Sequence, residues 1–214
     1  ECGILSRYPI VSLRTHRYGV MPGSQAPRLL LEAQLDAGGQ ELWLLVAHWK
    51  SKLEGAEQTE PERVAAASLA ASVIQEILAA NPLAAVVLAG DLNENPDEQS
   101  SVSYTTALPN TLGMSMDRSV SIASLGTSRP ILYSPWADCG GFSYIHDGTS
   151  ERIDHLIVSP SLAGANDGPS LVRFGVAAPD FALDAQGQPI AYRSSTGTGF
   201  SDHLPLYAFI VQRP

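Results

Sequence analysis

Cysteine is scarce in this sequence, which has only Cys2 and Cys139 among 214 residues. Two cysteines cannot form a framework of several disulfides, and their wide separation does not match the paired spacing of a zinc site. They are compatible with one disulfide or with two buried thiols. A single disulfide suits an exported protein, so a secreted or periplasmic location is favoured over a cytoplasmic one.

Long hydrophobic runs are also absent. No stretch reaches the roughly 18 uninterrupted apolar residues that a membrane helix needs, and the chain does not open with the charged and apolar parts of a targeting signal. We therefore expect no membrane span. Because the chain starts at Glu1 and runs directly into an apolar stretch, we expect that an upstream segment is cleaved or supplied separately.

Positive charge is in short supply, since 13 Lys and Arg face 22 Asp and Glu, for a formal net charge of −9. An acidic protein does not coat nucleic acid through its overall field. The charges are uneven along the chain, because residues 1–52 hold six basic and four acidic side chains. This distribution allows one locally basic face.

Hydrophobic residues make up 44% of the sequence, which is enough for a sizeable core in a single domain spanning residues 1–214. Strand and helix periodicities alternate along the chain, as is typical of an α/β protein. Residues 4–10 show a strand pattern that a proline closes. Residues 29–36 and 41–49 flank a Gly-Gly pair, and this arrangement predicts a β-hairpin.

A helix is predicted next, because Thr59-Glu60-Pro61-Glu62 has capping-box spacing with a proline in the first turn. Apolar residues then recur at helical spacing up to an end near Asn81, at Val64, Ala67, Ala71, Ile74 and Leu78. Three further strands are expected at residues 84–89, 152–159 and 205–211. The long stretches rich in Ser, Gly, Pro and Asp between them are expected to form functional surface loops.

Polar side chains stand at or just after the ends of the expected strands. They lie in four short segments, at residues 47–51, 90–93, 152–155 and 201–203. An α/β sheet builds its ligand site at the ends of strands, so we expect these segments to converge. Phe142 and Tyr144 alternate in a further expected strand, where they either pack in the core or stack on a base.

Most residues in these segments also have a purely structural explanation. His48 can be a partly buried imidazole that bonds to a carbonyl, and Asp91 with Asn93 can form a turn before the following proline. Asp202 can cap a turn. Asp154 differs, because a carboxylate inside an apolar strand needs a cation, a metal or a histidine as its partner.

Taken together and in this order, the segments resemble the successive motifs of the endonuclease/exonuclease/phosphatase superfamily. The motifs are Gly3-Ile4-Leu5-Ser6-Arg7-Tyr8-Pro9-Ile10, His48-Trp49-Lys50-Ser51-Lys52, Gly90-Asp91-Leu92-Asn93, Arg152-Ile153-Asp154-His155 and Ser201-Asp202-His203-Leu204-Pro205-Leu206. The His-aromatic-Lys-Ser form is similar to its bacterial nuclease-like branch. The resemblance implies a two-layer β-sandwich flanked by helices, a four-layer α/β fold with its site in a cleft along the top edge.

The resemblance also implies a role for each catalytic residue. His203 is the general base or the histidine that stabilises the transition state, and Asp154 orients it. Asp91 activates the attacking water or protonates the leaving oxygen. Asn93 and His48 donate hydrogen bonds to the phosphoryl oxygens and to the charge that develops there.

A divalent cation is part of what the resemblance implies. Asp202 and Asp91 are the expected ligands, and an oxygen-rich set of this kind suits Mg²⁺ or Mn²⁺ better than zinc. Asn93, Lys50 and Arg63 are the expected substrate-binding residues. For Arg63, a solvated arginine in the first helical turn is the structural alternative.

The sequence departs from the family pattern at its start. In the family, one N-terminal strand supplies an Asn and a later one supplies the Glu that is the principal metal ligand, and both precede the Leu-Ser-Arg-Tyr-Pro segment. Here that segment follows almost at once, and Glu1 lies too close to it to replace the ligand. We expect a fold that is incomplete at the N-terminus, completed by an N-terminal fragment or a second chain, and weak metal binding by the chain alone.

The function predicted from these motifs is divalent-metal-dependent hydrolysis of phosphodiester bonds, with nucleic acid as the substrate of an endonuclease-like reaction. One alternative is a phosphatase or phosphodiesterase that acts on a small or lipid-linked phosphoester, which the net acidity of the chain favours. Another alternative is a non-catalytic remnant that binds a partner chain.

Overall fold

The computed structural model describes residues 2–18, 29–164 and 168–212. Its largest element is a seven-stranded sheet with the order β1-β2-β3-β4-β9-β6-β5. The strands of this sheet are β1 (Ile10–Arg17), β2 (Leu29–Asp36), β3 (Glu41–Val46), β4 (Ala85–Asp91), β5 (Met114–Ser115), β6 (Leu132–Tyr133) and β9 (Asp154–Val158). Strand β4 is parallel to β3 and antiparallel to β9, so the sheet is mixed.

Two small strand pairs and several helices complete the described fold. The strand pairs are β7 (Tyr144–His146) with β8 (Thr149–Glu151), and β10 (Pro169–Val176) with β11 (Leu206–Gln212). The α-helices are α1 (Ala56–Ala80), α2 (Arg118–Ala123) and α3 (Pro160–Ala163). The short helical turns are η1 (Lys52–Glu54), η2 (Glu98–Ser100), η3 (Ala107–Leu112), η4 (Pro135–Asp138) and η5 (Asp180–Ala182).

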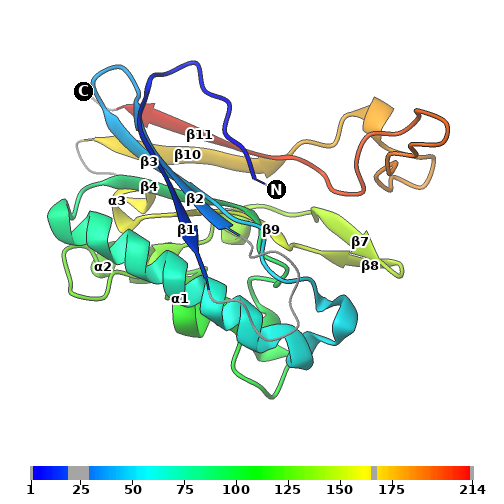
Figure 1. The fold of residues 1–214 in the computed structure, drawn as a ribbon, viewed down its shortest axis with the longest axis horizontal. Helices are drawn as coiled ribbons and strands as arrows, with labels where there is room; N and C mark the ends of the chain where they lie inside the picture. Colours follow the sequence, from blue (N-terminus) through cyan, green and yellow to red (C-terminus); the bar gives the residue numbers. More distant parts are fainter. Residues whose placement is uncertain (1, 19–28, 165–167, 213–214) are drawn as a thin grey trace.

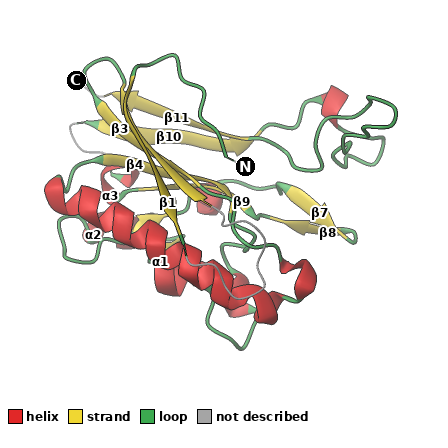
Figure 2. Ribbon diagram, in the orientation of Figure 1, coloured by secondary structure: helices red, strands yellow, loops and turns green. Residues whose placement is uncertain are grey.

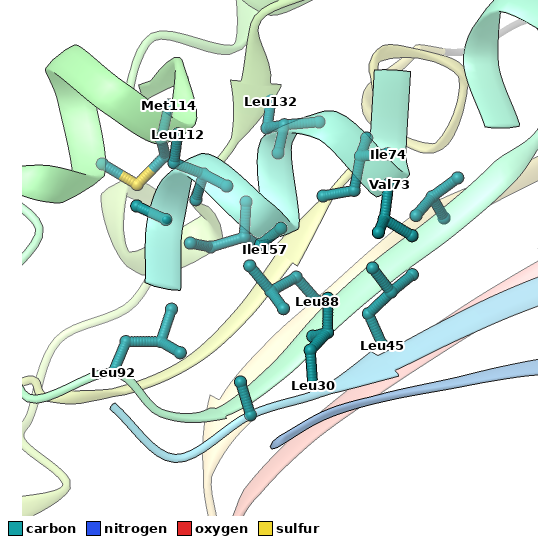
Figure 3. Packing of buried hydrophobic residues seen from close by; sticks show 14 of the residues in the cluster. Leu30, Leu45, Val73, Ile74, Leu88, Leu92, Leu112, Met114, Leu132 and Ile157 are labelled. Carbon is teal, nitrogen blue, oxygen red and sulfur yellow. The ribbon is translucent and has the colours of Figure 1, made fainter. Parts of the chain in front are cut away.

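The main sheet is covered on both faces. Figure 1 shows the long helix α1 across one face and the β10–β11 pair across the other, and Figure 2 shows the same layers by type of structure. Leu45 and Leu88 of the sheet pack against Val73 and Ile74 of α1 (Figure 3). On the opposite face, a second core joins the sheet to β10 and β11 through residues such as Leu171. This layered arrangement confirms the predicted α/β fold.

The hairpin of β2 and β3 confirms a prediction made from local sequence. Its antiparallel register runs from Leu31 opposite Val46 to Asp36 opposite Glu41. Gly38 and Gly39 make the turn with φ angles of 74° and 86°, a region that glycine enters without a steric penalty. The returning strand ends at Val46, earlier than expected, and the chain continues toward His48 without strand structure.

The first strand is displaced from its predicted position. The pattern of residues 4–10 predicts a strand there, but β1 begins only at Ile10. Within the preceding segment, the Ser6 hydroxyl bonds to the carbonyl of Tyr8 and accepts the N–H of the same residue, while Pro9 has no N–H to donate. These local hydrogen bonds compete with a strand, and the side chain of Leu5 is fully exposed.

Helix α1 starts earlier than the sequence predicts. Its cap is Gly55, not Thr59, and Pro61 lies inside the helix instead of in its first turn. The Thr59 hydroxyl donates to the Gly55 carbonyl at 2.7 Å, so it serves the helix from within. Among the described helices, α1 alone is long and apolar enough to cross a membrane by length and composition. Here its buried side chains pack on the sheet.

Neither cysteine forms the disulfide that the sequence allows. Cys2 and Cys139 are both partly buried, and the structure does not join them. The structure therefore gives no disulfide that would support a secreted or periplasmic location, and this location stays a prediction from sequence.

Candidate active site

Two aspartates face one another at the centre of the candidate site. Strand β4 ends at Asp91 and β9 begins at Asp154, and the antiparallel register places these two residues directly opposite. The convergence predicted for the polar segments is therefore present, although Asp154 stands at the start of its strand. Directly paired residues on neighbouring strands lie about 5 Å apart, so the two carboxylates share one edge of the sheet.

His203 is held against Asp154 and against an aromatic ring. Its Nδ1 lies 2.7 Å from Asp154 Oδ2, and its imidazole stacks on Tyr144 with ring centroids 4.5 Å apart and an interplanar angle of 27°. Burial alone would lower the pKa of His203, but the hydrogen bond and charge of Asp154, aided by Asp91 and Asp202, raise it above its ordinary value. The ring therefore has a fixed orientation and an increased basicity.

Asp91 forms a second pair with His48. The Nε2 atom of His48 lies 3.4 Å from Asp91 Oδ2, while Asp91 Oδ1 accepts the backbone N–H of Asn93 at 2.9 Å. The side-chain amide of Asn93 is buried and donates to the Trp49 carbonyl at 3.2 Å. In the structure, the side-chain N–H of Asn93 thus links its own loop to the segment of Trp49. The sequence predicts instead that this side chain donates to the phosphoryl group.

Gly90 is required by the close approach of two chain segments at this edge. Its φ angle is 129°, and an added Cβ would stand 1.9 Å from the carbonyl oxygen of Ala47. We expect Gly90→Ala to lower the free energy of unfolding by about 3 kcal/mol or more, because backbone strain adds to a contact that cannot relax. Denaturant titration measures the loss.

Gly126→Ala is the matched control for this substitution. Gly126 also has a positive φ angle, of 73°, but an added Cβ would have nothing within 4 Å. It should lose only about 1 kcal/mol, the ordinary penalty of a left-handed conformation for a residue with a Cβ. Equal losses in the two variants would show that the contact with Ala47 is not the reason for Gly90.

A cavity of about 620 Å³ opens beside these residues. Its walls come from η1, η2, the β7–β8 pair and the ends of the main strands, and they include His48, Asp91 and His203. Lys52, Glu98, Tyr104 and Glu151 also line it, and the sequence patterns did not mark the last three as functional. They lie in loops and short strands that carry no periodic signal, so only their spatial position identifies them.

Arg63 corrects the sequence-based prediction. Its side chain is completely buried, and it donates to Glu60 Oε2 from Nε at 2.9 Å and from Nη2 at 2.7 Å. Further hydrogen bonds reach the Thr59 hydroxyl and the Lys50 carbonyl. The prediction of a substrate-binding Arg63 is wrong, because the whole guanidinium group is used inside the protein. The solvated alternative is wrong for the same reason.

Lys50 and Asp202 lie outside the cavity wall. Lys50 Nζ forms an ion pair with Glu54 Oε1 at 2.9 Å, and Asp202 is exposed next to His203. Among the described residues that line the cavity, the only Lys or Arg is Lys52. Of these two neighbouring lysines, the structure thus places Lys52, and not Lys50, on the cavity wall.

Carboxylates dominate the electrostatics around the two Asp–His pairs. Burial raises the pKa of the Tyr144 hydroxyl, and the charges of Asp202, Glu151, Asp91 and Asp147 raise it further. An anionic phosphoester would be repelled by this field unless a cation neutralised it. The oxygen chemistry of these side chains thus suits Mg²⁺ or Mn²⁺.

The described residues do not form a complete cation site. Within residues 2–18, 29–164 and 168–212, no three His, Cys, Asp or Glu side chains gather closely enough to hold a metal ion. Mg²⁺ usually takes only one or two protein carboxylates and completes its shell with water and substrate phosphate. Asp91 and Asp202, whose charges both act on His203 and Tyr144, are the carboxylates that such a set would use.

His155 and Glu94 form a buried polar layer beneath the site. The Nε2 atom of His155 lies 2.9 Å from the Glu94 carbonyl oxygen, and the Glu94 carboxylate accepts the N–H groups of Ala107 and Leu108. Burial raises the pKa of Glu94 to about 7, against these two hydrogen bonds. Burial also lowers the pKa of His155 to about 4, so this imidazole is neutral and structural.

The buried His155 predicts a dependence of stability on pH. Between pH 6.5 and about 4 the unfolded chain binds a proton at His155 that the folded protein rejects, so stability falls as the pH falls through this window. The advantage of the wild type over His155→Gln in free energy of unfolding should shrink by about 3 kcal/mol across it. Denaturant titrations at several pH values would show this, and a constant difference would contradict it.

Comparisons with known proteins agree with this fold. Residues 25–212 match the model of the Endonuclease/Exonuclease/phosphatase family. No curated protein matches this chain in a search of such proteins. Among solved structures, truncated TDP2 from Caenorhabditis elegans is 21% identical and superposes with a TM-score of 0.57, covering 94% of this chain and 65% of its own.

Two further solved structures show the same fold at low identity. The mannosyl-6-phosphatase of Bacteroides thetaiotaomicron is 18% identical with a TM-score of 0.58, covering 95% of this chain and 67% of that one. TDP2 of D. rerio, complexed with a single-strand DNA product, is 16% identical with a TM-score of 0.55, covering 96% and 69%.

The chain therefore spans 65% of the length of the first of these structures. The family model nevertheless covers most of the sequence, from before β2 to the end of β11, and includes every residue of the two Asp–His pairs. This chain belongs to the endonuclease/exonuclease/phosphatase family.

Proposed function

We propose that this chain hydrolyses phosphodiester bonds by in-line attack of water, assisted by a divalent cation. The observation that carries the proposal is the pair of Asp–His contacts, Asp154 with His203 and Asp91 with His48, at one edge of a cavity. Two such pairs can handle the two protons of a hydrolysis, one at the attacking water and one at the leaving oxygen.

His203 acts on the attacking water in this proposal. Asp154 accepts a hydrogen bond from Nδ1, which leaves Nε2 as the proton acceptor and keeps the ring in one tautomer. Tyr144 holds the plane of the ring by stacking. As Nε2 takes the proton, the carboxylate of Asp154 stabilises the imidazolium that forms.

Asp91 and His48 act on the phosphoryl group and the leaving oxygen. In the structure His48 Nε2 contacts Asp91 Oδ2, which keeps the imidazole on that side of the cavity. When substrate is bound, the same N–H turns from Asp91 to the phosphoryl group and donates to the charge that develops there. The N–H of Asn93 fixes one Asp91 oxygen, so the other remains directed toward His48. Each group is held in place before the reaction, which is how enzymes stabilise developing charge.

We propose Mg²⁺ or Mn²⁺ as the cation, held by Asp91 and Asp202 with the substrate phosphate. When bound, such a cation withdraws negative charge from the phosphoryl group. Isothermal calorimetry with MgCl₂ tests this directly. Binding that Asp91→Asn and Asp202→Asn each weaken would support the ligand assignment, and unchanged binding in both variants would contradict it.

For the substrate, the cavity favours a small or lipid-linked phosphoester. Asp91, Glu98 and Glu151 line it together with one lysine, and this balance disfavours a polyanion. Nucleic acid, which the motifs predict, is the second candidate, because TDP2 of D. rerio carries a single-strand DNA product at 16% identity. Both belong to the same reaction class.

Salt dependence separates the two substrates. Plasmid DNA or RNA with Mg²⁺ should be cut ever more slowly as salt rises, since each phosphate contact releases counterions. Hydrolysis of bis(p-nitrophenyl) phosphate should depend little on salt. Activity on the model diester together with inertness toward plasmid and RNA would decide for the small substrate, and the reverse result would decide for nucleic acid.

A non-catalytic protein that binds a partner chain is a candidate of another class. Large apolar side chains of β10 and β11 are exposed, with Val172 at 49%, Phe209 at 54% and Val211 at 40%. A strand from an N-terminal fragment or a second chain would cover such a surface. Intact mass and native size of the purified protein test this, because a monomer that is folded and soluble leaves no place for an obligatory partner.

A further inference from the structure

Lys52 is held between two carboxylates on the cavity wall. Its Nζ lies 2.9 Å from Glu98 Oε2 and 3.8 Å from Glu151 Oε1. All three side chains are largely buried, at 19%, 7% and 18% exposure, so solvent screens their charges only partly. Together with Tyr104 we call these residues the Lys52 wall.

Glu98 cannot turn away from Lys52 without losing other contacts. Its Oε2 also accepts the N–H of Asn95 at 2.9 Å, and the Tyr104 hydroxyl lies 3.5 Å from its Oε1. Further carboxylates stand behind it, because Glu98 interacts electrostatically with both Glu60 and Glu94. The positive charge of Lys52 is therefore already balanced by carboxylates of the protein when a substrate enters the cavity.

The charge of the Lys52 wall is negative overall. Lys52 contributes one positive charge, and Glu98 and Glu151 contribute two negative ones. Among the described residues around the cavity, no other Lys or Arg takes part in its lining. A second anionic group on the substrate would thus face carboxylates with no spare lysine or arginine, and like charges brought together in a partly buried site repel strongly.

We propose that the Lys52 wall binds an uncharged, hydrogen-bonding part of the substrate and rejects a second anionic group. The inference rests on the proposed phosphodiester hydrolysis and narrows its substrate to esters with one phosphate in the cavity. The carboxylates of Glu98 and Glu151 accept hydrogen bonds from hydroxyl or amide groups. Tyr104 and Tyr144, which line the same cavity, offer apolar ring surface to the rest of the group.

Two symmetrical diesters test the proposal. They are bis(p-nitrophenyl) phosphate and bis(3-carboxy-4-nitrophenyl) phosphate, and the second carries an added carboxylate whichever way round it binds. We expect the wild-type protein with Mg²⁺ to prefer the first by about tenfold or more in kcat/KM, since repulsion acts in the transition state as in binding.

Glu98→Gln and Glu151→Gln each remove one counter-charge of Lys52. Either change should narrow the preference of the enzyme, the ratio of kcat/KM for the uncharged diester to kcat/KM for the carboxylated diester, by roughly three- to tenfold. Glu54→Gln is the matched control, because Glu54 pairs with Lys50 in the same segment but outside the cavity. It should leave the preference unchanged. Glu151→Gln alone keeps the test valid if Glu98→Gln does not fold.

The outcomes distinguish this inference from the proposed function. If the wild type hydrolyses both diesters with equal kcat/KM, the inference is overturned and the proposed hydrolysis stands. The same conclusion follows if the wild type prefers the uncharged diester but neither variant narrows this preference. If neither diester is hydrolysed, calorimetry on the intact diesters replaces kinetics. Tighter binding of the uncharged diester would then support the inference, although the proposed hydrolytic function would be rejected. If neither diester binds, the inference and the proposed function are both overturned.

Discussion

His203→Gln should lower the turnover of bis(p-nitrophenyl) phosphate by roughly 10²- to 10⁴-fold, the usual contribution of a general acid or base. Glutamine cannot take the proton of the attacking water, and it loses the contact of the imidazole with Asp154. The side chain is about a quarter exposed, so the fold should survive. Steady-state kinetics measures the loss, and circular dichroism checks the fold.

His146→Gln is the matched control for His203. His146 lines the same cavity and is about half exposed, but it contacts neither carboxylate of the two Asp–His pairs in the described contacts. It should change turnover by less than about threefold. If His203→Gln were as active as the control, His203 would have no part in the reaction.

Asp154→Asn should separate orientation from charge at the same site. Asparagine can still accept a hydrogen bond from Nδ1, but it no longer stabilises the imidazolium. Because Asp154 raises the pKa of His203, the variant should lower it, and the fall in activity on acidification should move to lower pH. An unchanged pH profile would contradict the role of Asp154.

Arg63→Met should lower the free energy of unfolding by about 3 to 5 kcal/mol, the usual result of removing one partner of a buried ion pair. The change leaves Glu60 buried without its cation, and burial already raises the pKa of Glu60 against the opposing effect of Arg63. It also frees the Lys50 carbonyl, which the Arg63 guanidinium holds. Denaturant titration would show the loss.

Two comparisons make the Arg63 prediction specific. Arg129→Met removes an exposed arginine and should change stability by less than about 0.5 kcal/mol. The double variant Glu60→Met with Arg63→Met should recover part of the loss, because it leaves no unpaired buried charge. An effect of Arg63→Met no larger than that of Arg129→Met would show that the buried network adds nothing to stability.

Local patterns predicted most of the sheet because the signals are short-range. Alternation and a Gly-Gly turn specify the β2–β3 hairpin within a few residues. The apolar run before Gly90 specifies β4, which the structure places at Ala85–Asp91. The start of α1 was misjudged because Thr59 and Pro61 are a valid start signal. The helix instead extends back to Ala56, and the Arg63 guanidinium donates to the Ala56 carbonyl.

In the candidate site, too, short motifs predicted the residues, but the contacts between them depend on segments far apart in the sequence. His48, Asp91, Asp154 and His203 were recognisable because each belongs to a short motif. Their pairing was not deducible from spacing, since the contact of Asp154 with His203 joins residues 49 apart in the chain. Lys52 and Glu98 are 46 residues apart, and neither stands in a pattern that points to the other.

The sequence by itself determined the family, the β2–β3 hairpin, the positions of β4 and β9 and the four residues that form the Asp–His pairs, because motifs and periodicity are properties of neighbouring residues. Tertiary structure alone decided which charged side chains face the cavity. It buries Arg63 against Glu60, pairs Lys50 with Glu54 and sets Lys52 between two carboxylates. Burial and charge pairing depend on segments that meet only after folding, so the chemical character of the cavity cannot be assigned before the chain is folded.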